Sequence, residues 1–171
     1  MACAFRSTAA TGHFPRLPCP PGVSCDPVST LYFAYGSNLV LDQMAQRCPR
    51  SRTMGTAVLT GWRFRINAGG WATIVPESGA RVYGLLWDLP PEDEASLDLY
   101  EEMPSGLYAK QVLTVQPASG TARDAMVYLA LDPSPGKPTP RYWDPILAAA
   151  RSCGFPPDYL EELQTWGPVR S

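Results

Sequence analysis

The feature that most constrains the fold is a succession of strand-like segments joined by short connections. The segments with the β-branched, aromatic and apolar composition of strands are residues 31–35, 53–67, 71–77, 81–89, 106–116 and 122–131. The second is interrupted at Gly61, a Ser-Gly turn signal separates the third from the fourth, and the last two resemble a hairpin across Pro-Ala-Ser-Gly. Strands joined in this way exclude a regular βαβ alternation. We therefore expect an α+β domain, a curved sheet or small barrel with helices packed outside it.

Helical segments are fewer and lie between or after these strands. They are predicted at residues 39–48, 90–103, 141–154 and 156–166. Pro49 closes the first helix, and the second begins with proline in its first turn and early acidic residues that suit the helix dipole. A proline-rich loop, residues 132–140, precedes the last two helices.

The chain changes character at Thr30. Residues 1–29 are rich in Pro, Ser and Gly and lack periodicity, which predicts a flexible N-terminal extension. They contain two arginines and no acid before Asp26, so a transit peptide is the alternative. Residues 30–171 are long and apolar enough to form one globular domain.

Charge and cysteine usage exclude several classes of partner. The net charge is −2 and the 14 basic residues are scattered, so we expect no nucleic-acid partner. The apolar runs are too short to span a bilayer, so we expect no membrane segment. The five cysteines form no CxxC pair and the only histidine, His13, lies in the extension, so we expect no metal site and a reduced, cytoplasmic location.

The first candidate site is the Gly-Ser-Asn sequence that ends the strand at residues 31–35. Consecutive backbone N–H groups at such a turn, with a helix following from Leu39, can hold carboxylate or carbonyl oxygens. Gly36 would allow a ligand to approach closely and would permit an unusual φ. The alternative is that Ser37 or Asn38 merely caps the helix.

The second candidate site is the acidic end of the helix at residues 90–103. At about 100° per residue, its apolar arc contains Leu97, Leu99, Tyr100 and Met103. Glu101 borders this arc, whereas Glu102 continues an outward stripe of acidic residues, Glu94 and Asp98. A partly desolvated Glu101 would have a raised pKa suited to a general base. The alternative is an ordinary solvated acid at a helix end.

Taken together and in order, several motifs resemble the γ-glutamyl cyclotransferases of the AIG2-like superfamily. They are "YFAYGSNL", "ATIVP", "VYGLLWDL", "SLDLYE" followed by "SGLY", and "PTPRY" before a C-terminal helix. The resemblance covers roughly residues 31–165. It implies a small mixed β-barrel with flanking α-helices and a cofactor-free enzyme, a lyase or acyltransferase, that converts γ-glutamyl amino acids to 5-oxoproline and a free amino acid.

The resemblance also implies residue roles. Glu101 would be the catalytic acid and base, Gly36 and Ser37 would present backbone amides to the glutamyl group, and Tyr142 would close the pocket, although an aromatic residue at a helix start can also simply pack on the core. The implied substrate-binding residues are Tyr32, Phe33, Ala34, Tyr35, Gly36, Ser37, Asn38 and Tyr142.

One position departs from the family pattern, which usually has glycine after the catalytic glutamate. Glu102 stands there, and it would be strained if the position needs a positive φ, or would raise the pKa of Glu101 further. Which of the two acids acts therefore stays open at this stage.

The identity of the substrate and the oligomeric state also stay open. The leaving group could be that of a γ-glutamyl amino acid, glutathione, a γ-glutamylamine or a γ-glutamylated natural-product intermediate. A non-catalytic member of the fold would instead bind a small metabolite or a protein. Retention of Glu101 favours the enzyme, since a binder of an anionic group gains nothing from a further buried negative charge. A monomer is the default expectation and a homodimer the alternative.

Overall fold

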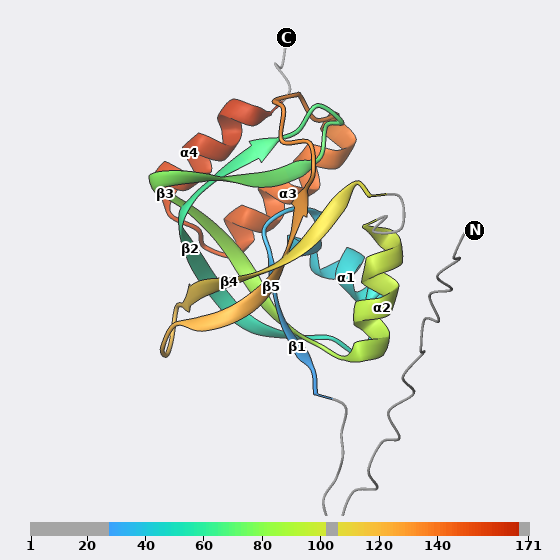
Figure 1. Ribbon diagram of the computed structural model, residues 1–171. Coiled ribbons are helices and arrows are strands. Elements are labelled where there is room, and N and C mark those ends of the chain that lie inside the picture. Colours follow the sequence, from blue (N-terminus) through green and yellow to red (C-terminus); the bar gives the residue numbers. More distant parts are fainter. Residues whose placement is uncertain (1–27, 102–105, 168–171) are drawn as a thin grey trace, which may run out of the picture.

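The computed structural model describes residues 28–101 and 106–167 (Figure 1). The predicted extension at residues 1–29 therefore lies outside the described residues except for its last two positions, and so does Glu102. The elements are β1 (Thr30–Ala34), η1 (Ser37–Leu39), α1 (Leu41–Arg47), β2 (Arg52–Ile66), β3 (Ala72–Leu89), α2 (Pro91–Tyr100), β4 (Tyr108–Pro117), β5 (Arg123–Ala130), α3 (Pro140–Ser152) and α4 (Pro157–Trp166).

The five strands form a closed barrel in the order β1-β3-β2-β4-β5. Neighbouring strands are antiparallel except for β1 and β5, which close the barrel as a parallel pair at Tyr32 and Met126. The expectation of a small mixed barrel with flanking helices is confirmed. Closure pairs β1 on both sides, so the strand that leads into the Gly-Ser-Asn turn is held on two neighbours.

One prediction about the strands is wrong: residues 71–77 and 81–89 are not separate strands. They belong to the single strand β3, and the predicted Ser-Gly turn is an irregularity within it. Trp62 on β2 pairs with Pro76 and Thr60 pairs with Arg81, so four residues of β3, 77–80, stand opposite the single residue Gly61 of β2. Gly79 adopts a φ of 82° there. The glycine bends the strand without reversing it, because β2 continues on both sides as a partner.

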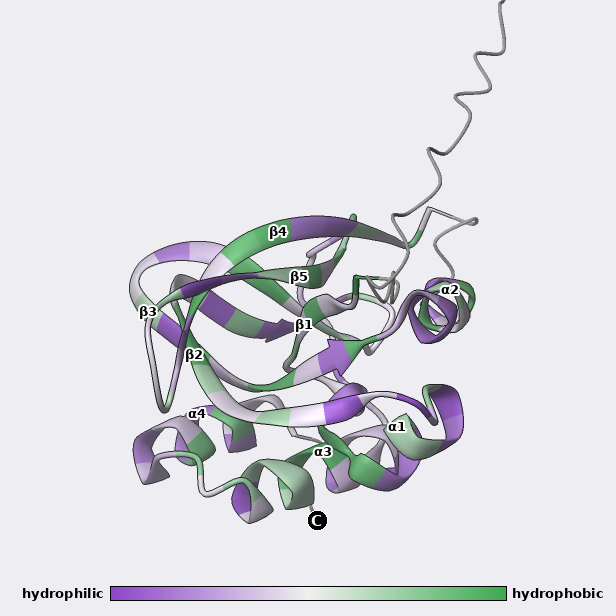
Figure 2. Ribbon diagram, turned by 90° about the horizontal axis from the view of Figure 1, so that it is seen from below, coloured by the Kyte–Doolittle hydropathy of each residue, from purple (hydrophilic) through white to green (hydrophobic). Residues whose placement is uncertain are grey.

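The helices cover the outside of the barrel. In Figure 2, α1, α3 and α4 lie along one side of the barrel and α2 lies apart from them. The side chain of Trp143 on α3 is buried, with its ring 5.9 Å from that of Phe64 on β2. Among the described residues, no helix is long and apolar enough to cross a membrane.

The second predicted helix differs from the observed one. α2 ends at Tyr100 and Glu101 forms its C-cap, so the predicted extension to residue 103 is not seen within the described residues. Leu97 is fully buried as expected, but Leu99 and Tyr100 are 71% and 49% exposed. The predicted apolar arc is therefore wrong at these two positions, because the helix packs on the barrel only over a narrow stripe.

Close packing between β1 and β3 fixes the strand that leads into the candidate turn. A Cβ atom added at Gly84 would lie 2.4 Å from the carbonyl oxygen of Ala34 and 2.7 Å from the ring of Phe33. No side chain can be accommodated at that distance without moving the backbone of β1.

We predict that Gly84→Ala destabilises the protein by about 3 kcal/mol, the upper range for overpacking a core. Gly120→Ala is the control: its φ is 104°, but nothing lies within 4 Å of the added Cβ atom, so strain alone should cost about 1–2 kcal/mol. Urea unfolding of both variants measures the difference. Equal costs would show that β1 and β3 can separate freely at Gly84.

Candidate active site

A small cavity lies where η1, the start of β3, the end of α2 and the start of α3 converge; we call it the inner cavity. Seven residues predicted from the sequence line it: Tyr32, Tyr35, Gly36, Ser37, Asn38, Glu101 and Tyr142. The other two, Phe33 and Ala34, are fully buried in the barrel core and do not line it. The structure thus brings together two candidate sites that lie more than sixty residues apart in the sequence.

The Gly-Ser-Asn turn forms a single turn of 3₁₀-helix, in which the N–H of Leu39 donates to the carbonyl oxygen of Gly36 (2.9 Å). Gly36 has a φ of −113°, so glycine is not required there for a left-handed conformation. It is required for space, because an added Cβ atom would lie 2.9 Å from that of Ala72 and 3.6 Å from Tyr142 Oη. The expected unusual φ is therefore wrong. The atoms that approach Gly36 belong to the protein, so close approach of a ligand stays a prediction.

The alternative that Ser37 or Asn38 caps a helix is wrong. Neither η1 nor α1 has a side-chain cap, and α1 begins after Val40. Instead both side chains accept hydrogen bonds from Arg47 Nη1, through Ser37 Oγ and Asn38 Oδ1. The polar side chains of the turn therefore build the site rather than start the helix.

Glu101 lies at the C-terminus of α2, where its N–H donates to the carbonyl oxygen of Leu97 (2.8 Å). Its carboxylate Oε1 accepts a hydrogen bond from Asn38 Nδ2 (3.0 Å), and the same nitrogen donates to Tyr32 Oη (2.8 Å). Asn38 is buried. Because Arg47 donates to the other end of the carboxamide, the NH₂ group of Asn38 is the end that faces Glu101.

Burial raises the pKa of Glu101 above the ordinary value of a glutamate. The hydrogen bond from Asn38 and the positive charge of Arg47 act in the opposite direction, since both favour the ionised form, but they do not cancel the effect of burial. A carboxyl group in this state can both accept and release a proton closer to neutral pH than a solvated one.

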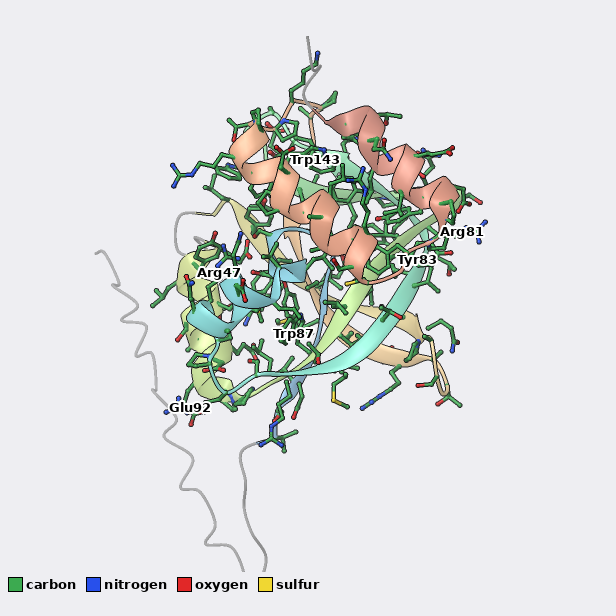
Figure 3. All side chains as sticks on the ribbon, turned by 180° about the vertical axis from the view of Figure 1, so that it is seen from behind. Arg47, Arg81, Tyr83, Trp87, Glu92 and Trp143 are labelled. Carbon is green, nitrogen blue, oxygen red and sulfur yellow. The ribbon has the colours of Figure 1, made fainter. Side chains whose placement is uncertain are left out.

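Arg47 was not predicted as a site residue. It lies between α1 and α2 (Figure 3), with its guanidinium 3.7 Å from the centre of the Tyr100 ring. Nη2 donates to Gln43 Oε1 (2.8 Å) and to Tyr100 Oη. Its role depends on contacts between separate helices, so nothing in the local sequence marks it.

Tyr108 and Tyr128 also line the inner cavity and were not predicted individually. Tyr108 Oη donates to the carbonyl oxygen of Ala72 (3.2 Å), and the N–H of Ala72 donates to Tyr142 Oη (3.0 Å). Burial raises the pKa of both Tyr108 and Tyr142, so each keeps its proton at neutral pH. Tyr108 is the last residue of the "SGLY" motif, which was a signal for it.

A second, outer cavity of about 280 Å³ adjoins the first. Ser37, Glu101, Tyr108 and Tyr142 line both cavities, and Trp71, Tyr100 and Leu107 line only the outer one. Glu101 is thus at the boundary between a small polar space and a larger apolar one. In the described part of the chain, no three His, Cys, Asp or Glu residues are grouped as ligands of a metal ion would be.

Comparisons with known proteins identify the family to which the chain is similar. Residues 81–163 match the model of the AIG2-like family. The human protein named gamma-glutamylcyclotransferase is 30% identical over 153 residues, which are 84% of this chain and 81% of the human protein. The Bos taurus protein of the same name is 30% identical over 155 residues, which are 85% of this chain and 82% of the Bos taurus protein. A solved structure titled gamma-glutamyl cyclotransferase superposes with a TM-score of 0.76 at 29% identity, covering 84% of this chain and 90% of that one.

The raised pKa of Glu101 predicts that its charge costs stability. The folded protein holds the proton of Glu101 more tightly than the unfolded chain does. The stability that this proton contributes is therefore fully present at low pH and is lost as pH rises through the folded-state pKa. Glu101→Gln removes the charge and keeps an acceptor for Asn38. We therefore expect its Tm to exceed that of the parent protein at pH 7–8, by about 2–4 °C for each kcal/mol gained.

Calorimetry at several pH values measures this difference, which should shrink as pH approaches 4. The matched control is Glu161→Gln, at an exposed glutamate on α4, which should leave the Tm unchanged. A Glu101→Gln variant less stable than the parent at pH 8 would contradict the assignment of a desolvated carboxylate.

Proposed function

The chain belongs to the γ-glutamylcyclotransferase family, and on that premise we propose that it converts γ-glutamyl amino acids or related γ-glutamyl compounds to 5-oxoproline and a free amino acid or amine. The observation that carries the proposal is the position of Glu101. Its carboxylate, with a raised pKa, lines the same cavity as the Gly36 turn.

The reaction asks little of the protein, because the nucleophile is part of the substrate. The α-amine attacks the γ-carbonyl carbon, a new C–N bond closes a five-membered ring, and the original amide C–N bond breaks. Intramolecular attack supplies much of the rate once the chain of the glutamyl group is held folded. Proton transfer and stabilisation of the oxyanion are the steps that remain.

Glu101 is proposed as the group that moves the proton. In its ionised form it takes a proton from the attacking amine, and in its protonated form it gives that proton to the departing nitrogen. The hydrogen bond from Asn38 holds one carboxylate oxygen, which leaves the second oxygen for the substrate. Glu101 is thus the general base first and the general acid second.

The turn and Tyr142 are proposed to bind the glutamyl group. The turn's own hydrogen bonds use the N–H groups of Leu39 and Val40, so those of Gly36 and Ser37, which precede them, are suited to an anionic oxygen of the ligand. Tyr142 Oη already accepts from the N–H of Ala72, so its own proton can be donated into the cavity.

The simplest test is to incubate the protein with γ-glutamyl-alanine, glutathione and γ-glutamyl-lysine and to measure 5-oxoproline. We expect product, most of it from γ-glutamyl-alanine. The "AYGSN" form of the turn, together with the late "PTPRY", resembles the γ-glutamyl amino acid enzymes more than the glutathione-specific or γ-glutamylamine branches of the family. If the folded protein forms no product from any of the three, the non-catalytic alternative is favoured.

A second prediction distinguishes the two adjacent acids. Glu101→Gln should lower kcat by about 100-fold or more, the range for loss of a general acid and base, while Glu102→Gln should retain most of the activity. In the parent protein the rate should fall as pH drops through the raised pKa of Glu101, because the base is then protonated. Equal losses, or the larger loss at Glu102, would overturn the assignment.

A further inference from the structure

The outer cavity is not needed to bind the glutamyl group, and its lining differs in kind from that of the inner cavity. We propose that it binds the leaving group of the substrate and selects amines or amino acids that carry an aromatic ring or a comparably large apolar group. The inference rests on the proposed function, since it assumes that the scissile amide lies at Glu101.

The outer cavity presents apolar surface to solvent. Trp71, Leu107 and Tyr100 are 49%, 50% and 49% exposed, and they come from three separate segments, the chain before β3, the chain before β4 and the end of α2. All three line this one cavity. Large apolar side chains that remain half-exposed around a shared concavity are typical of a ligand-binding surface rather than of random surface positions.

The aromatic wall of the cavity is held in place before any ligand arrives. The backbone N–H of Trp71 donates to Asn67 Oδ1 (2.9 Å), and its carbonyl oxygen accepts from the N–H of Asn67 (2.8 Å). The indole ring packs edge-to-face on Tyr142, with ring centres 4.8 Å apart and planes at 89°. A preorganised aromatic surface costs little to order on binding, so a ligand ring gains most of the contact energy.

Charge argues against recognition of an acidic leaving group. Among the described residues that line the outer cavity there is no lysine or arginine, and the one charged side chain is that of Glu101. Arg47 lies nearby, but its guanidinium is already bound to Ser37, Asn38, Gln43 and Tyr100. A carboxylate on the leaving group would therefore have to compete with these hydrogen bonds to pair with Arg47. Burial of apolar area is the interaction that the outer cavity itself offers to distinguish substrates.

The position of Glu101 determines which part of the substrate enters this space. Because Glu101 lines both cavities, a glutamyl group in the inner cavity places the scissile nitrogen near their boundary. The substituent on that nitrogen then extends past Trp71 and Leu107. With about 280 Å³, the outer cavity is large enough for a ring.

The test compares kcat/KM for γ-glutamyl-phenylalanine and γ-glutamyl-alanine, which differ only by the ring. We expect the phenylalanine compound to be preferred by about tenfold or more. Trp71→Ala and Leu107→Ala should each lower this ratio toward one. Leu99→Ala is the matched control, because Leu99 is also an exposed leucine but does not line the outer cavity, and it should leave the ratio unchanged.

Binding to the Glu101→Gln variant, measured by calorimetry, separates this inference from the proposed function. Tighter binding of γ-glutamyl-phenylalanine than of γ-glutamyl-alanine, lost in Glu101→Gln/Trp71→Ala, would support the apolar site even if the parent protein formed no 5-oxoproline. Equal affinity and equal kcat/KM for the two compounds would overturn the inference while leaving the cyclotransferase proposal intact. A preference that persists in Trp71→Ala and Leu107→Ala would also overturn it.

Discussion

The site depends on one partly buried hydrogen bond, from the carboxamide of Asn38 to the carboxylate of Glu101. It joins the turn after β1 directly to the end of α2, and it holds a charge where burial opposes ionisation. A carboxylate with no partner in such a place would be protonated or would turn to solvent. A full ion pair would lower its pKa and remove its use as a base. The amide of Asn38 is a neutral donor that Arg47 orients, and its effect on the carboxylate is weaker than that of an ion pair and stronger than that of no partner.

Barrel closure is what allows this contact to form. β1 is paired with β3 on one side and β5 on the other, so the turn that follows it has a fixed origin. The first residue of β3, Ala72, then joins two tyrosines of the cavity wall, since its N–H and C=O bind Tyr142 and Tyr108. Side chains from distant parts of the sequence thus meet because the strands that carry them are hydrogen-bonded neighbours or close the same end of the barrel.

Much of this site could be predicted from the sequence, and the parts that could not share a cause. The strands, the turn and the orientation of Glu101 toward the interior could be predicted because they depend on local patterns of apolar and polar residues. The continuity of β3 depends on β2 as a partner, and a Ser-Gly pair looks the same in a bend as in a reversal. The exposure of Leu99 and Tyr100 depends on how little of α2 touches the barrel. Arg47 acts only through contacts with other elements, so no local pattern reveals it.

The two cavities divide the chemical task by polarity. Under the proposed function, ring closure occurs in the glutamyl group, which is the same in every substrate of this class. The inner cavity would bind that group through backbone amides, tyrosine hydroxyls and one carboxylate. The departing amine varies between substrates and takes no part in ring closure beyond accepting a proton. Residues that line the outer cavity, such as Trp71 and Leu107, can therefore be substituted without disturbing the hydrogen bond that holds Glu101. If the proposed roles hold, substitutions at the outer cavity would alter substrate specificity and leave the proton-transfer geometry of the inner cavity unchanged.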